Sequence, residues 1–379
     1  MHARPSDTIE LALAPLDRVR VRALHWTMPL SSRLARAREA RVAAIGSSVV
    51  VIALLATLLA PLWLLALGPI LLGVPHLLAD VRYCLVRPGW HRERALWLTA
   101  GVPLLAVACG SGFEIGLLGV AASALVISGE LRRRVAVAVA ALVLAFVGWR
   151  LESLADLFLA HAHNFIAVAL WASWRPRASK LHWIPLAAFV LLAAALLLGL
   201  GDPVWSRSDP IWWSRGDAGL PSGLDRNAHL AALAPSVPGV WASRLVLLYC
   251  FAQAVHYGVW LRMVPEDDRE RPTPRSFRAS YRALRDDFHP LILAGFALAA
   301  VALAIWACVD LVEARTGYFR FARFHGMLEL LAAGLLLAHG RPRRLISGPP
   351  PGATTGRRTY LARSERSERL TFERPRGAK

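Results

Sequence analysis

Long apolar runs are the feature of this sequence that most constrains its fold. They recur along most of the chain in lengths of roughly 17 to 22 residues, which is about what a helix needs to cross ~30 Å of hydrocarbon. A membrane barrel would need short segments of alternating polarity instead. Of the 379 residues, 56% are hydrophobic and 18% charged, and the mean hydropathy is +0.43. The sequence therefore predicts an all-α fold, a polytopic transmembrane helical bundle.

The apolar runs predict about ten spans, and the basic residues predict their orientation. Arginine and lysine cluster before the first span and then in every second connection, so both termini are expected in the cytoplasm. This distribution accounts for most of the net charge of +18 and argues against nucleic acid as a partner. The predicted spans are 43–66, 69–87, 95–109, 113–130, 135–149, 153–173, 183–200, 242–262, 290–309 and 320–340.

Three regions follow from these spans: a basic cytoplasmic N-terminal segment (1–42), a transmembrane helical domain (43–340) and a basic, disordered cytoplasmic tail (341–379). Within the domain, the tryptophan-rich outer loop 201–241 reads as an interfacial belt or a lid. The cytoplasmic loop 265–285 has room for a short surface helix. Stretch 18–41 is arginine-rich and suited to the membrane surface.

Polar side chains at membrane depth are the candidates for function, because each is costly there. Four predicted spans carry histidine, and the direction assigned by the arginines is the same for all four. The candidate metal ligands are His76 in the second span, His161 and His163 in the sixth, His256 in the eighth and His325 in the tenth. Imidazoles offered at similar depth by four helices of one direction are what a metal site in a bundle core requires.

Two carboxylates extend this pattern. Asp80 follows His76 by four residues and Glu329 follows His325 by four, so each acid shares a helical face with its histidine. They are the candidate catalytic residues, either as partners of a ligating imidazole or as interhelical hydrogen-bonding groups. His161 and His163 point to different faces, so at most one is expected to ligate, and the spacing leaves the choice open.

The donor set indicates a metal. Imidazole without thiolate suits iron, copper or zinc, and we expect Fe²⁺ that activates dioxygen on a lipid-soluble substrate.

The segment GVPHLLADVRY around His76 resembles the signature of the bacterial Brp/Blh-type β-carotene 15,15'-dioxygenases, with Gly-x-Pro-His and an aspartate four residues after the histidine. That family usually has glycine where this chain has Leu77, and the resemblance covers about a dozen residues. It implies a multi-pass protein of the bacterial inner membrane, His76 as an iron ligand, less surely a role for Asp80, and a carotenoid or other isoprenoid or lipid substrate cleaved to a product such as retinal.

Other uses of the same residues stay open. A transporter or proton-relay protein also needs buried histidine and carboxylate, without metal. A b-type haem protein is suggested by His325 and His339, fourteen residues apart, although no second helix repeats the spacing. A fatty-acid desaturase or hydroxylase would carry HxxxH and HxxHH clusters, and this sequence has neither. The sequence leaves the oligomeric state open.

Overall fold

A computed structural model describes residues 5–27, 37–173, 177, 179–206, 223–268 and 275–340. The chain divides into a unit of residues 1–345 and a unit of residues 346–379, and only the first contains described residues. The predicted disordered tail and part of the tryptophan-rich loop, including Trp212 and Trp213, lie outside the described residues.

The fold is all-helical, as the sequence predicts, and the described residues contain no strand. The longer helices are α1 (Pro5–Thr27), α3 (Arg38–Leu59), α4 (Pro61–Val81), α7 (Phe113–Val126), α8 (Leu131–Leu151), α9 (Ser153–Ser173), α10 (Trp183–Leu197), α13 (Val240–Gly258), α15 (Phe277–Asp287), α16 (Pro290–Val309) and α17 (Leu311–His339). The shorter ones are α5 (Arg94–Leu96), α6 (Val102–Ala108), α11 (Asp202–Ser206), α12 (Arg226–Leu233) and α14 (Val264–Asp267), with a 3-10 turn η2 (Trp90–Arg92). Three π-helical turns continue α4, α5 and α13: η1 (Arg82–Val86), η3 (Trp97–Gly101) and η4 (Val259–Met263).

Seven continuous helices in the described residues are long and apolar enough to cross a membrane. They are Arg38–Leu59, Pro61–Val86, Leu131–Leu151, Ser153–Ser173, Val240–Asp267, Pro290–Val309 and Leu311–His339. Three further apolar helices, Arg94–Ala108, Phe113–Val126 and Trp183–Leu197, are shorter. All ten predicted segments are therefore helical, whereas the number that crosses a bilayer and the side of each terminus remain predictions.

Two helix boundaries differ from the predicted spans. The first span was expected to end at residue 66, but α3 ends at Leu59 and α4 begins at Pro61. Proline is favourable in the first turn of a helix, where its missing N–H needs no partner, so Pro61 starts the helix and Pro69 lies inside it. The last span was expected to begin at residue 320, but α17 begins at Leu311, because Arg315 finds partners inside the bundle.

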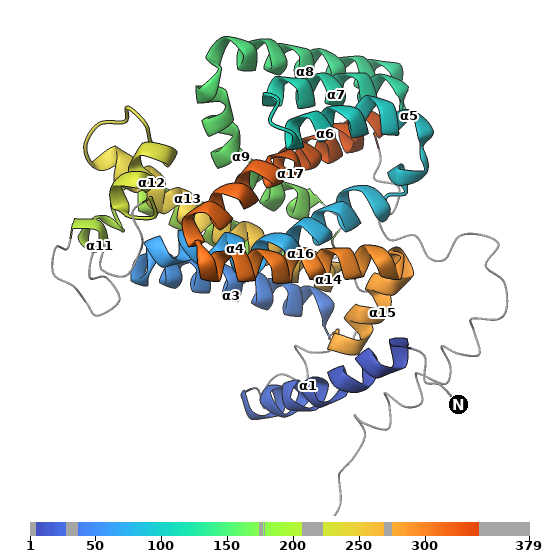
Figure 1. Cartoon of the computed structure of the whole chain (residues 1–379), viewed down its shortest axis with the longest axis vertical. Coiled ribbons are helices and arrows are strands. Elements are labelled where there is room, and N and C mark those ends of the chain that lie inside the picture. Colours follow the sequence, from blue (N-terminus) through green and yellow to red (C-terminus); the bar gives the residue numbers. More distant parts are fainter. Residues whose placement is uncertain are drawn as a thin grey trace, which may run out of the picture. The chain divides into compact units, whose positions relative to one another are not determined.

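Four helices form the centre of the bundle: α4, α9, α13 and α17. In Figure 1, α17 runs along α4 and reaches α9, and α13 lies against α4 and α9. Near their N-terminal ends, Leu65 of α4 packs in one cluster with Val246 of α13, and Ala66 packs in another with Val312 of α17. Contacts half-way along these helices again join α4, α13 and α17. The central helices therefore run in the same direction, as the arginine pattern predicts.

The outer helices α8 and α16 present apolar surface outward. Within an apolar stretch of 18 residues in each helix, only 22% is buried in the fold for α8 and 6% for α16. Their exposed side chains include Phe146 and Trp149 on α8 and Leu298 and Ile305 on α16. A continuous apolar surface of this kind is stable against lipid and unstable against water. The fold is that of a multi-pass membrane protein.

Buried ion pairs hold the C-terminal ends of the central helices. Helix α13 and its continuation end in the sequence Glu266, Asp267, Asp268, which we call the acidic segment. Each acid faces an arginine from a different part of the chain: Glu266 faces Arg41 of α3 at 2.7 Å, Asp267 faces Arg177 after α9 at 2.7 Å, and Asp268 faces Arg87 after α4 at 3.4 Å. Three helix ends are thus joined at one place that the sequence analysis treated only as a loop.

The predicted short helix of this loop is α15, and it contacts α1 (Figure 1). Asp17 of α1 accepts hydrogen bonds from the backbone N–H of Phe277 at 2.7 Å and from Nε of Arg278 at 3.1 Å. The carboxylate lies at the N-terminus of α15, where negative charge stabilises the helix dipole. The N-terminal segment is therefore attached to the same end of the bundle as the acidic segment.

We predict that Glu266→Gln lowers the free energy of unfolding by ~3–5 kcal/mol, because a buried arginine loses its carboxylate. Denaturant titration of the purified protein in micelles, followed by circular dichroism, measures the change. Glu130→Gln is the matched control: Glu130 pairs with Arg133 at 3.2 Å, but both side chains are about half exposed, so the cost should stay below ~1 kcal/mol. Equal stability of the two variants would show that the acidic segment does not hold the helix ends.

Candidate metal centre

Four buried imidazoles meet in the middle of the bundle. His76 of α4, His163 of α9, His256 of α13 and His325 of α17 are each at most 9% exposed. The ring centroids lie 4.9 Å apart for His76 and His325, 5.0 Å for His325 and His163, 5.1 Å for His163 and His256, and 5.3 Å for His256 and His76. Neighbouring rings pack edge to face, so the four form a closed set around one point. We call them the histidine layer.

The position of each histidine along its helix explains the layer. His76 follows Pro61 by 15 residues, His256 follows Val240 by 16, and His325 follows Leu311 by 14. His163 follows Ser153 by 10. Helices of one direction with nearly aligned starts therefore bring these rings to one level, roughly 15–24 Å from the helix starts at 1.5 Å per residue. The level is near the middle of the helices.

Hydrogen bonds fix the tautomers of three rings. Nδ1–H of His76 donates to the Gly73 carbonyl at 2.6 Å, that of His163 donates to Leu159 at 3.1 Å, and that of His325 donates to Ala322. A carbonyl can only accept, so Nδ1 carries the proton and Nε2 keeps its lone pair. This is the usual preparation of a metal-binding imidazole, in which a backbone carbonyl orients the ring.

A second level of polar groups lies one helical turn further along. Asp80, Trp260 and Glu329 each follow a histidine of the layer by four residues, and the fourth position is the small residue Ala167. Asp80 Oδ2 lies 3.6 Å from Nε2 of His76 on the same helix, while Glu329 Oε1 lies 3.6 Å from Nε2 of His256 on a neighbouring helix. Trp260 Nε1–H donates to Glu329 Oε1 at 2.6 Å. Both expected arrangements of the acids, on the same helix and across helices, thus occur. Both carboxylates are fully buried.

Several polar atoms of this cluster are buried without a hydrogen-bond partner. Among the described residues these include Nε2 of His76, both ring nitrogens of His256, both oxygens of Asp80 and Oε2 of Glu329. An unsatisfied buried polar atom costs ~1–3 kcal/mol, so native structures rarely contain several together without a ligand, ion or water. The orphaned atoms face one another, which is the signature of a place prepared for a cation.

The distances suit a metal ion. One ligand atom each from His76, Asp80, His256 and His325 can be chosen so that all lie within 4.8 Å of one another. Metal–nitrogen bonds are ~2.0–2.2 Å long, so ligands on opposite sides of an ion lie roughly 4 Å apart. Small movements of these side chains would close the difference. The four residues could therefore hold a metal ion, and His163 is placed to join them.

Tyrosines enclose the layer from α13 and α17. The ring of Tyr257 lies 4.8 Å from that of His76, and the Tyr318 hydroxyl lies 3.5 Å from His76 Nδ1. A Cβ on Gly73 would come within 2.5 Å of the Tyr318 ring. The glycine of the Gly-x-Pro-His segment is therefore needed for this close packing, and its carbonyl orients His76.

A cavity of about 480 Å³ reaches the histidine layer from the N-terminal side of the central helices. His163, His256 and His325 line it, together with Gln253 and Tyr249 one to two turns before His256. Asp80, Trp260 and Glu329 are not among its lining residues. The cavity thus opens onto one face of the layer, and the acids close the other. Its volume is within the usual range for small-molecule sites.

His161 lies outside the histidine layer. Its Nε2 is 2.9 Å from the Leu233 carbonyl, and its ring packs on Tyr249 at 5.1 Å. Since residues two apart on a helix face different directions, only His163 of this pair turns toward the layer. Asp156, another polar residue of α9, forms an ion pair with Arg323 at 2.7 Å.

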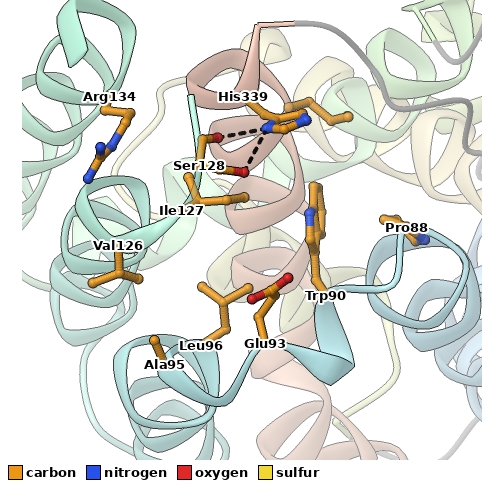
Figure 2. A pocket seen from close by; sticks show the side chains of 11 residues that line it. Pro88, Trp90, Glu93, Ala95, Leu96, Val126, Ile127, Ser128, Arg134 and His339 are labelled. Atoms are coloured by element: carbon orange, nitrogen blue, oxygen red, sulfur yellow. Dashed lines mark hydrogen bonds between the residues drawn. The ribbon is translucent and has the colours of Figure 1, made fainter. Parts of the chain in front are cut away.

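A separate pocket of about 350 Å³ lies near the C-terminal end of α17 (Figure 2). His339 lines it and its Nδ1–H donates to the backbone carbonyl of Ser128 at 2.6 Å. Figure 2 shows Trp90, Glu93 and Arg134 around the same space. Among the described residues that line this pocket His339 is the only histidine, so the pocket offers no second axial ligand for the b-type haem suggested by His325 and His339.

Sequence reasoning missed three residues near the site: Trp260, Tyr318 and Arg315. Trp260 lies four residues after His256, and the same spacing that identified Asp80 and Glu329 would have found it. Tyr318 and Arg315 precede the predicted start of the last span, so they were placed outside the membrane. Residues 311–323 contain Glu313, Arg315, Arg320 and Arg323, so no apolar run signals that the helix begins at Leu311.

The fold and site together define a class: a membrane-embedded helical protein with a buried histidine and carboxylate cluster that could hold a metal ion. Comparisons with protein-family models, with curated proteins and with solved structures find no match.

We predict that His163→Ala lowers the bound divalent metal of the purified protein by about tenfold or more, a loss typical of removing a group at a metal site. Metal analysis by mass spectrometry at equal protein concentration measures it. His161→Ala is the matched control, two residues away on the same helix, and should keep at least half of the wild-type metal. Equal metal content in the two variants would contradict the assignment of His163.

Proposed function

We propose that this protein is an integral membrane, non-haem iron oxygenase that acts on a lipid-soluble substrate, with cleavage of a carotenoid to an apocarotenoid such as retinal as the reaction to test first. The observation that carries the proposal is the cavity, because it brings a substrate-sized space directly onto three imidazoles whose opposite face is closed by buried acids.

The donor set supports iron. Four imidazoles and two carboxylates without thiolate suit Fe²⁺ as well as copper or zinc. His76, His163, His256 and His325 would hold the ion, and Asp80 and Glu329 would balance its charge and orient the rings. Bound ferrous iron would supply the activation of dioxygen.

The residues around the metal site would bind the substrate and exclude water. The cavity wall is built largely of apolar helix positions such as Leu159 and Phe319, so a hydrocarbon chain can replace water there. Exclusion of water protects a reactive centre from side reactions and strengthens the electrostatic interactions within it. The cavity would also hold the substrate at a fixed distance from the imidazole rings. Such positioning raises the rate of the reaction.

The resemblance of GVPHLLADVRY to the Brp/Blh-type β-carotene dioxygenases supports the choice of carotenoid, and with it a multi-pass protein of the bacterial inner membrane. In that family the histidine corresponding to His76 is taken as an iron ligand. Central cleavage of one β-carotene by one dioxygen gives two retinal molecules, each with one oxygen atom, and needs no external reductant.

The second candidate is a transporter or proton relay in which His and Asp or Glu exchange protons without metal. It is favoured by the 3.6 Å contacts between buried imidazoles and carboxylates, since proton pathways use such pairs. The two candidates differ in one cheap measurement: the relay predicts a purified protein without stoichiometric metal.

We expect membranes of a β-carotene-producing bacterium that expresses the protein to bleach and to accumulate retinal. Under ¹⁸O₂, each retinal should gain one labelled oxygen. His325→Ala should reduce the rate by at least ~100-fold, because one ligand and one wall of the cavity are lost, whereas His161→Ala should retain most of it. If the iron-loaded protein leaves β-carotene intact and consumes no dioxygen with it, the carotenoid proposal fails. A metal-free protein that moves protons would favour the relay.

A further inference from the structure

A positively charged side chain lines the cavity at a distance from the histidine layer. Arg315 lies on α17 ten residues before His325, and both side chains border the same cavity. Ten residues of helix correspond to roughly 15 Å along its axis. The cavity therefore has a cationic group at a distance from its imidazoles, and its other charged lining residues, Asp156 and Arg323, pair with each other.

Two of the five N–H groups of Arg315 are used for structure. Its Nε–H donates to the Leu65 carbonyl of α4 at 2.9 Å, and Nη2–H donates to Nε2 of His229 on α12 at 3.2 Å. Its guanidinium also lies 4.9 Å from the centre of the Phe319 ring. In the described part of the chain, Nη1 has no hydrogen-bond partner, so one donor edge of the guanidinium is available.

His229 does not neutralise this charge. Its Nδ1–H donates to the Asp225 carbonyl at 2.8 Å, which leaves Nε2 as the acceptor for Arg315. Burial, together with the positive charge of Arg315, lowers the pKa of His229, so the ring is neutral near pH 7. The pair therefore carries one full positive charge.

Other inward-facing arginines of this fold have an acid within ion-pair distance, and Arg315 does not. Arg41, Arg82, Arg177 and Arg323 face Glu266, Asp287, Asp267 and Asp156 respectively, each at 2.6–2.7 Å. Among the described residues no carboxylate is within ion-pair distance of Arg315. A guanidinium inside an apolar bundle without an anion is costly. That cost is removed when an anion enters the cavity.

A second donor faces the same space. The Tyr249 hydroxyl, which also lines the cavity, accepts a hydrogen bond from Nε2–H of Gln253 at 3.2 Å. Its own proton has no acceptor within the described residues. Arg315 and Tyr249 are close enough to interact electrostatically. A carboxylate has two oxygens and accepts from two such donors well.

We propose that the cavity binds a long-chain carboxylate, with its acid group on Arg315 and Tyr249 and its chain directed to the histidine layer. This rests on the proposed oxygenase and changes its substrate class to lipids with one anionic end, which excludes β-carotene because that hydrocarbon has no acid group. Roughly 15 Å corresponds to about twelve carbon–carbon bonds of extended chain, so the carbon presented to the histidines would be set by counting from the acid. Arg315 is a positioning residue in this arrangement.

The test compares a fluorescent polyene fatty acid, cis-parinaric acid, with its methyl ester. The full chain in lipid nanodiscs is titrated at pH 8, and energy transfer from its tryptophans reports bound probe against a background of empty nanodiscs. We expect the acid to bind at least tenfold more tightly than the ester. Arg315→Met should reduce this preference to less than twofold. Arg244→Met, which removes an arginine paired with Asp202 at 2.6 Å and absent from the cavity lining, should leave it unchanged.

If the wild-type protein binds the acid and the ester equally, the inference is overturned. This outcome does not depend on whether Arg315→Met folds. A preference that survives in a folded Arg315→Met also overturns the inference. His325→Ala separates the two proposals, because it should lose metal and keep the preference for the acid. If the wild-type protein prefers the acid but binds no iron, this inference stands and the proposed oxygenase function fails. If it binds iron and cleaves carotenoid without preferring the acid, the proposed function stands and this inference fails.

Discussion

The structure depends on buried polar atoms that no described protein group satisfies. His76, Asp80, His256 and Glu329 present ring nitrogens and carboxylate oxygens to one another in the middle of the bundle. In a purely apolar core the same positions would pack without this cost. A shared cation could take one ligand atom from each of His76, Asp80, His256 and His325, and backbone carbonyls already hold the Nδ1–H groups of His76, His163 and His325. The cluster therefore makes physical sense as a binding site and little sense as packing.

The contacts at the two ends of the bundle serve this centre. A shift of one residue along a helix axis moves a ring by 1.5 Å and turns it by about 100°, so the histidine layer requires fixed helix registers. The acidic segment ties α13 to the ends of α3, α4 and α9. At the other end, Arg315 ties α17 to α4 and α12. The starts of α4 and α17 and the C-terminal ends of α4, α9 and α13 are thus fixed, and the site can be precise although most of the surrounding contacts are non-directional.

The sequence predicted the all-helical fold, the common direction of four helices and the meeting of His76, His256 and His325 with one of His161 and His163. It could do so because polar residues are rare at membrane depth and because arginines mark alternate connections. It could not choose between His161 and His163, because the choice depends on how α9 is rotated, and that rotation is set by neighbours such as Leu233. The ion pairs of the acidic segment were also out of reach, since their partners are up to 225 residues apart in the chain. Helix starts were misplaced where proline and arginine were taken as boundaries.

The side chains one helical turn beyond the acids bear on how the cluster of histidines and carboxylates can work. The residues seven positions after the layer histidines are Tyr83, Leu170, Met263 and Ala332, and all are buried. Of these four side chains only Tyr83 is polar, and its hydroxyl accepts from Arg82 on the side of the acidic segment. On the other side the cavity meets three of the four rings directly. A relay needs polar groups or water continuing in both directions, whereas a metal centre needs one open face and one closed face. The asymmetry of this site matches the second requirement.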